Sequence, residues 1–93
     1  MGIYEQVGEQ IKDAMRARDA ARTTALRNIR AGFIEALKLD NSKELTDEQC
    51  IAVLRKLAKQ RQESIDAYTA GGRADLADAE SAELRVIDAF LPQ

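Results

Sequence analysis

The sequence predicts an all-α protein, a compact bundle of about four helices. Alanine is abundant and β-branched residues are scattered, which favours helix over strand. The one proline, Pro92, stands next to the end of the 93-residue chain. No apolar–polar alternation typical of a strand lasts for more than a few residues.

The first two helices are predicted from apolar side chains spaced three and four positions apart. The first helix is expected from about Tyr4 to Ala17, and the second is expected to begin after Asp19, which can cap its N-terminus. The second helix is expected to end at the polar turn of residues 40–42. The two apolar faces comprise Ile3, Val7, Ile11, Ala14 and Met15, and Ala25, Leu26, Ile29, Phe33 and Leu37.

The third helix has the clearest start signal, a capping box in which the side chains of Thr46 and Gln49 each accept from the other's backbone N–H. Gly71 is expected to end this helix in the left-handed conformation. A fourth helix is expected from about Ala74 to a point before Pro92. Short connections favour antiparallel neighbours. The apolar faces comprise Cys50, Leu54, Leu57, Ile65 and Tyr68, and Leu76, Ala79, Ile87 and Phe90.

Composition excludes several classes of function. The chain has no histidine and one cysteine, so it lacks an imidazole base, a Ser–His or Cys–His nucleophile pair, a zinc site of the usual kinds and an intramolecular disulfide. We therefore expect no catalytic residue, no metal site and no cofactor. The single cysteine, the absence of a signal peptide and the absence of an apolar run of roughly 20 residues favour a cytoplasmic protein without a membrane partner. The length predicts one domain, residues 1–93.

Four ionisable side chains fall on the apolar faces of the predicted helices. They are Arg22, Arg61, Glu80 and Glu83. Because burying an unpaired charge costs several kcal/mol, we expect the two arginines to meet the two glutamates through two-pronged hydrogen bonds. One interpretation is a structural ion-pair cluster that fixes how the helices align. The other is a polar pocket that binds a small ligand or a charged group of a partner.

Basic residues on the outer faces form a second candidate site. From residue 12 to residue 30 the chain has six basic and two acidic residues, although its formal net charge is −2. If the second and third helices are neighbours, their outer edges form a surface that attracts phosphates. The alternative is a solvated helix face with no ligand. The candidate nucleic-acid-binding residues are Arg27, Arg30, Arg55, Lys56 and Lys59.

A series of short motifs covers nearly the whole chain and resembles the YqeY-like family. The motifs occur in the order expected for that family. They are Arg22-x-x-x-Leu26-Arg27, Leu45-Thr46-Asp47-Glu48, Ile51-x-Val53-Leu54-x-Lys56, Lys59-Gln60-Arg61-x-Glu63-Ser64-Ile65-x-x-Tyr68, Gly72-Arg73-x-Asp75-Leu76-Ala77, Glu80-x-x-Glu83 and Phe90-Leu91-Pro92-Gln93.

This resemblance implies a relation to the tail region of the B subunit of the glutamine-dependent tRNA amidotransferase. That enzyme is a carbon–nitrogen ligase with glutamine as amide donor, which converts mischarged Glu-tRNA or Asp-tRNA to the amide form. The tail region helps to hold the tRNA and contains neither the kinase-like nor the amidase active site. Members of the family normally continue into a second small helical domain, which we expect to be absent here because the sequence stops at Gln93. The chain is then either the N-terminal domain cut at the linker or a short member that has lost the second half.

The sequence therefore predicts a non-catalytic helical module whose partner is tRNA, bound through a basic helix edge, or an amidotransferase- or translation-related protein. The alternative is a protein–protein adaptor that docks its partner in a helix groove and makes no contact with RNA. An enzyme in its own right is disfavoured because no nucleophile–base pair is present.

Overall fold

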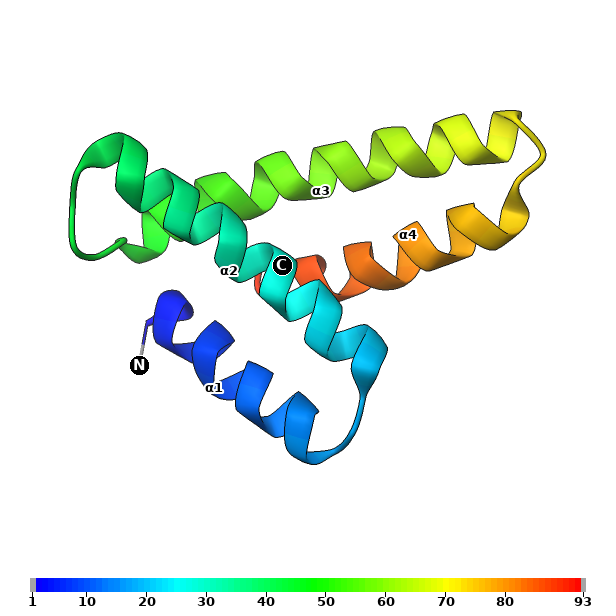
Figure 1. Ribbon diagram of the computed structural model, residues 1–93. Helices are drawn as coiled ribbons and strands as arrows, with labels where there is room; N and C mark the ends of the chain where they lie inside the picture. Colours follow the sequence, from blue (N-terminus) through cyan, green and yellow to red (C-terminus); the bar gives the residue numbers. More distant parts are fainter. Residues whose placement is uncertain (1, 93) are drawn as a thin grey trace.

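The computed structural model describes residues 2–92 and confirms the all-α fold (Figure 1). Its four helices are α1 (Ile3–Arg16), α2 (Ala20–Asp40), α3 (Asp47–Ala70) and α4 (Ala74–Asp88). Figure 1 shows α1 and α2 as one antiparallel hairpin and α3 and α4 as a second, with α2 crossing α3. The turn between α3 and α4 lies away from α1 and α2. The N-terminal half of α2 and the helix α4 diverge from the centre of the molecule.

The predicted helix starts are confirmed by their hydrogen bonds. The Asp19 carboxylate accepts from the Arg22 N–H at 3.1 Å. In the capping box, the Gln49 N–H donates to Thr46 Oγ1 at 3.2 Å, and the Thr46 N–H donates to Gln49 Oε1 at 2.9 Å. These bonds satisfy N–H groups that have no partner within the helix. The beginnings of α1 and α3 are also joined, because the Ile3 N–H donates to Asp47 Oδ1 at 2.9 Å.

α3 ends at Gly71 as predicted, but the left-handed residue lies one position later. Gly71 has an ordinary φ of −84°, whereas Gly72 has a φ of 74° and is the left-handed residue. The Arg73 N–H reaches the Tyr68 carbonyl at 2.8 Å, and the Gly72 N–H reaches the Thr69 carbonyl at 3.2 Å. This pair of bonds is a Schellman motif, which requires the positive φ one position after the helix cap.

One core joins all four helices. Burying these apolar side chains is the main favourable term for folding. Phe33 is completely buried on α2, and its ring lies 5.9 Å from that of Tyr4 on α1. Close contact of α2 with α3 depends on Gly32, where a Cβ would lie 3.2 Å from Val53 Cγ1. The buried cluster consists of Val7, Ile11, Ala14, Leu26, Ile29, Phe33, Leu45, Cys50, Leu54 and Ile87.

Two residues predicted for the apolar faces are exposed instead. Met15 is 52% exposed, at the edge of α1, and its sulfur contacts the Arg27 guanidinium at 3.5 Å. Ala79 is exposed on the side of α4 that faces the N-terminal half of α2. It leaves open space there because a methyl group is too short to bridge the two helices.

Candidate functional site

The charged residues at the centre of the α3–α4 hairpin form a three-residue ion-pair cluster. Nη1 of Arg61 lies 3.0 Å from Glu80 Oε2 and 3.0 Å from Glu83 Oε2. The glutamates are three positions apart, and this spacing places them side by side on α4. All three side chains are partly buried, with 18–30% of their surface exposed. One nitrogen serves both carboxylates, in place of the two-pronged geometry that we expected.

Arg22 does not join this cluster, contrary to the expectation from its helix face. Its Nη2 donates to Gln10 Oε1 on α1 at 2.6 Å. The reason is the position of α1, which packs beside the N-terminal half of α2 and offers a nearer acceptor. The side chain that reaches from α2 to the cluster is Asn28, whose Nδ2 donates to Glu83 Oε1 at 2.7 Å. Nothing in the pattern of α2 marks Asn28, because its partner is 55 positions away.

The five candidate phosphate-binding residues are all exposed, but the structure divides them between two faces. Arg27 and Arg30 lie against α1: Arg27 contacts Met15, and Arg30 lines a small hollow of about 240 Å³ with residues of α1. The other three lie on α3, turned from the side that meets α2 at Gly32. Within residues 2–92, none of the five forms an ion pair with an acidic side chain. The remaining three are Arg55, Lys56 and Lys59.

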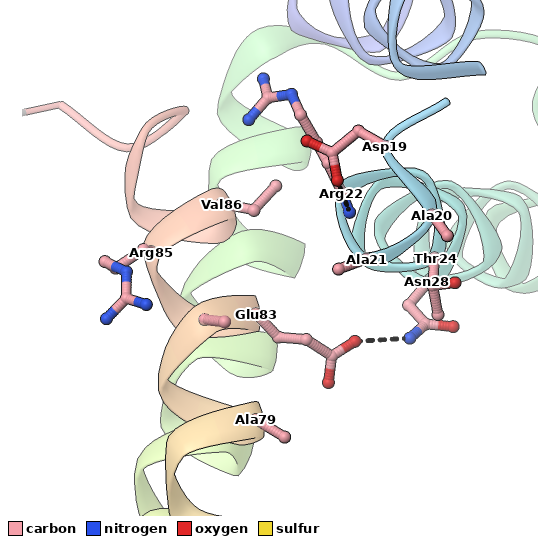
Figure 2. Close-up of a pocket in the computed structure, with 11 residues that line it drawn as sticks. Asp19, Ala20, Ala21, Arg22, Thr24, Asn28, Ala79, Glu83, Arg85 and Val86 are labelled. Carbon is pink, nitrogen blue, oxygen red and sulfur yellow. Dashed lines mark hydrogen bonds between the residues drawn. The ribbon is translucent and has the colours of Figure 1, made fainter. Parts of the chain in front are cut away.

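A groove of about 880 Å³ separates the N-terminal half of α2 from the C-terminal half of α4. Figure 2 shows its two walls and the hydrogen bond from Asn28 to Glu83 that joins them. Alanines and charged residues both line it. The wall on the α2 side is formed by Asp19, Ala20, Ala21, Arg22, Thr24 and Asn28, and the α4 wall by Ala79, Ala82, Glu83, Arg85 and Val86. The sequence pattern predicted Ala79 for the core and therefore did not indicate this groove.

Cys50 is fully buried in the core, as its place on the apolar face indicates. Burial raises the pKa of its thiol, and the nearby carboxylates of Asp47 and Glu5 raise that pKa further. The thiolate, which is the nucleophilic form, is therefore disfavoured. In the part of the chain that the structure describes, no cluster of three or more His, Cys, Asp or Glu side chains could hold a metal ion. Among the described helices, none combines the length and the apolar character needed to cross a bilayer.

Comparison with known proteins now supports the family suggested by the motifs. The family model described as "Yqey-like protein" matches residues 4–93, nearly the whole chain. The chain belongs to the YqeY-like family. Arg61, Glu80, Glu83 and the five basic residues all fall within the matched range.

Relatives from several organisms share one printed name, "Altered inheritance of mitochondria protein 41, mitochondrial". The protein of Eremothecium gossypii is 32% identical over 84 residues, which cover 89% of this chain and 45% of the relative. Those of Vanderwaltozyma polyspora and Candida glabrata are 33% and 32% identical, over 89% and 91% of this chain. The chain spans about half the length of these relatives, at 45–47%.

These relatives overturn one expectation. The composition favoured a cytoplasmic protein, but each of these YqeY-like relatives is named as mitochondrial. The cytoplasmic prediction is therefore wrong as judged from the relatives. A single cysteine fits any reducing compartment equally well, so it did not distinguish the cytoplasm from another one.

Proposed function

We propose that this YqeY-like protein is a non-catalytic helical module, related to the accessory regions of tRNA-dependent amidotransferases, that binds tRNA through its exposed basic residues. The observation that carries the proposal is the state of the five candidate side chains, which are exposed and have no acidic partner within residues 2–92. A cation that is not neutralised by its own protein is available to a phosphate, and its binding releases counterions from the nucleic acid.

The two faces differ in what they contribute to this proposal. Arg55, Lys56 and Lys59 lie within two turns of a single helix, on the exposed side of α3. Their spacing allows neighbouring phosphates of one RNA strand to be contacted at once. Arg27 and Arg30 lie beside α1 and extend the basic surface of the α1–α2 hairpin. Contacts of this kind position an RNA without reading its sequence, so we expect binding to many tRNAs with similar affinity.

The test is a salt titration of tRNA binding, measured by fluorescence anisotropy. Replacing Arg55, Lys56 and Lys59 with alanine removes three cations. It should weaken binding and make the slope of log K against log salt shallower by about 2–3, since each phosphate contact contributes roughly 0.7–0.9. The matched control replaces Lys43, Arg73 and Arg85, three exposed cations on other surfaces, and makes the same change in net charge.

The control variant should keep most of the affinity and the wild-type slope. The proposal that tRNA binds through this face would be wrong if the α3 triple substitution left the titration unchanged. It would also be wrong if both variants lost the same amount of tRNA affinity. Failure of the wild-type protein to bind tRNA at low salt would leave the adaptor alternative in its place.

A further inference from the structure

The helices α1, α2 and α3 end with the same backbone motif. After α1, the Arg18 N–H donates to the Met15 carbonyl at 3.1 Å, and the Asp19 N–H donates to the Ala14 carbonyl at 3.0 Å. The corresponding pairs of bonds follow α2 and α3. This Schellman motif needs a residue in the left-handed conformation at the end of the helix. The residues in that position are Arg18, with a φ of 58°, Asn41, with a φ of 50°, and Gly72, with a φ of 74°.

Arg18 is the unusual member of this set. Glycine and asparagine adopt the left-handed conformation readily, whereas in other residues the Cβ comes too close to a carbonyl oxygen of the backbone. A glycine at position 18 would form the same two hydrogen bonds without this strain. A strained backbone that the local structure does not require of this side chain points to a role for the side chain itself.

The fold does not use the charge of Arg18. The side chain is exposed, and within residues 2–92 it forms no ion pair and donates no hydrogen bond. The two acidic residues of the stretch from 12 to 30 are engaged elsewhere. Asp13 pairs with Arg16 at 3.3 Å, and the Asp19 carboxylate accepts from the Arg22 N–H. The Arg18 guanidinium is therefore available to an external anion.

A second unpaired arginine belongs to the same end of the α1–α2 hairpin. Arg27 of α2 lies 3.5 Å from the Met15 sulfur, and the Arg18 N–H bonds to the carbonyl of that same methionine. Figure 1 shows the connection between α1 and α2 at the bottom of the view, away from the turn between α3 and α4. Two arginines at an exposed end of the molecule can contact phosphates through paired N–H groups.

We propose that Arg18 is a phosphate-contacting residue of the tRNA-binding surface and that, with Arg27, it binds the RNA backbone at this end of the α1–α2 hairpin. The inference rests on the proposed function and adds to it a residue outside the five candidates. The strain at position 18 follows from placing a charged side chain where the helix end favours glycine. Since the contact is made to phosphate, it positions the RNA without reading its sequence.

The experiment measures thermal unfolding and the salt titration of tRNA binding on the same variants. Arg18→Gly removes the cation and the strain together, and Arg18→Lys retains a positive charge at the strained position. The first control is Asn41→Gly, which places glycine at the left-handed position after α2 without changing the net charge. The second control is Arg85→Ala, which removes one exposed cation from α4.

We expect Arg18→Gly to unfold at a higher temperature than the wild type, because glycine accepts the positive φ without strain. The same variant should bind tRNA about threefold more weakly, and its slope of log K against log salt should be shallower by about 0.7–0.9, the contribution of one phosphate. Arg18→Lys should keep the wild-type slope. Both controls should keep the wild-type affinity and slope. A gain in stability with a loss in affinity is the signature of a strained binding residue.

Four results would overturn the inference. Wild-type affinity and slope in Arg18→Gly, together with a loss in the α3 triple variant, would leave the proposed function in place without Arg18. An equal loss in Arg85→Ala would show that net charge, and not position, sets the affinity. A lower unfolding temperature of Arg18→Gly would show that the arginine stabilises the end of α1, where the helix dipole attracts a cation. A wild-type protein that binds no tRNA would contradict this inference and the proposed function together.

Discussion

Arg61 is the residue on which the α3–α4 ion-pair cluster depends. A single nitrogen of its guanidinium lies 3.0 Å from both glutamates. The contact is only partly buried, so its net contribution lies between that of a surface pair and that of a buried one. Its loss has a second cost, because two carboxylates would then face each other one turn apart without a cation.

We expect Arg61→Met to lower the free energy of unfolding by about 1–2 kcal/mol, measured by urea denaturation. Adding Glu80→Gln should recover part of the loss, because it removes the repulsion between Glu80 and Glu83. Additive losses in the double variant would show that the two glutamates do not interact through Arg61.

Ionisation of the Cys50 thiol lowers the stability of the protein at alkaline pH. Burial, followed by the charges of Asp47 and Glu5, raises the pKa of its thiol above the ordinary value. The folded state therefore holds the proton more firmly than the unfolded state does. The stabilisation is complete below the unfolded pKa of about 8.5 and is lost as the pH rises through the folded pKa.

The difference in unfolding free energy between wild type and Cys50→Ala should therefore shrink as the pH rises from about 7.5 to about 9.5. Both proteins contain the same tyrosines and lysines, so the contribution of their titration cancels in the difference between the two unfolding free energies. A difference that stays constant over this range would show that the thiol ionises equally easily in both states.

At the level of the helices, the same glycine-to-alanine change should have opposite effects at two positions. Gly8 lies inside α1, and a Cβ added there meets no atom within 4 Å. Gly72 has a φ of 74° in the turn between α3 and α4. Gly8→Ala should raise the free energy of unfolding by about 0.5–1 kcal/mol, because alanine favours helix. Gly72→Ala should lower it by about 1 kcal/mol, because a left-handed backbone strains a residue with a Cβ.

Thermal unfolding of the two single variants, compared with wild type, measures both effects. Each variant serves as the control for the other, since the added methyl group is identical and faces open space in both. Two shifts of the same sign would contradict the helix end described here.

Helix starts were more predictable than helix ends. The capping box of Thr46 and Gln49 and the cap at Asp19 were confirmed because each depends on groups only three residues apart. The left-handed residue after α3 was predicted one position too early. A pair of adjacent glycines leaves the choice of the left-handed position to the hydrogen bonds of the Schellman turn.

In the whole molecule, α2 connects the two hairpins. It packs on α1 through its N-terminal half, meets α3 at Gly32 and reaches α4 through Asn28. This arrangement separates charge. Three basic residues of α2, Arg22, Arg27 and Arg30, contact or line α1, whereas α4 is an acidic helix.

The sequence by itself determined the four helices, the caps at Asp19 and Thr46, most of the buried positions and the family. Each of these is encoded by residues close together in the chain or by motifs that require no packing. It also placed Arg61, Glu80 and Glu83 on inward faces. The tertiary structure alone decided that Arg22 bonds to Gln10, that Asn28 reaches Glu83, that the basic residues divide between two faces and that Ala79 lines a groove. These outcomes depend on which helices become neighbours and at what angle, and that is set by packing among residues far apart in sequence.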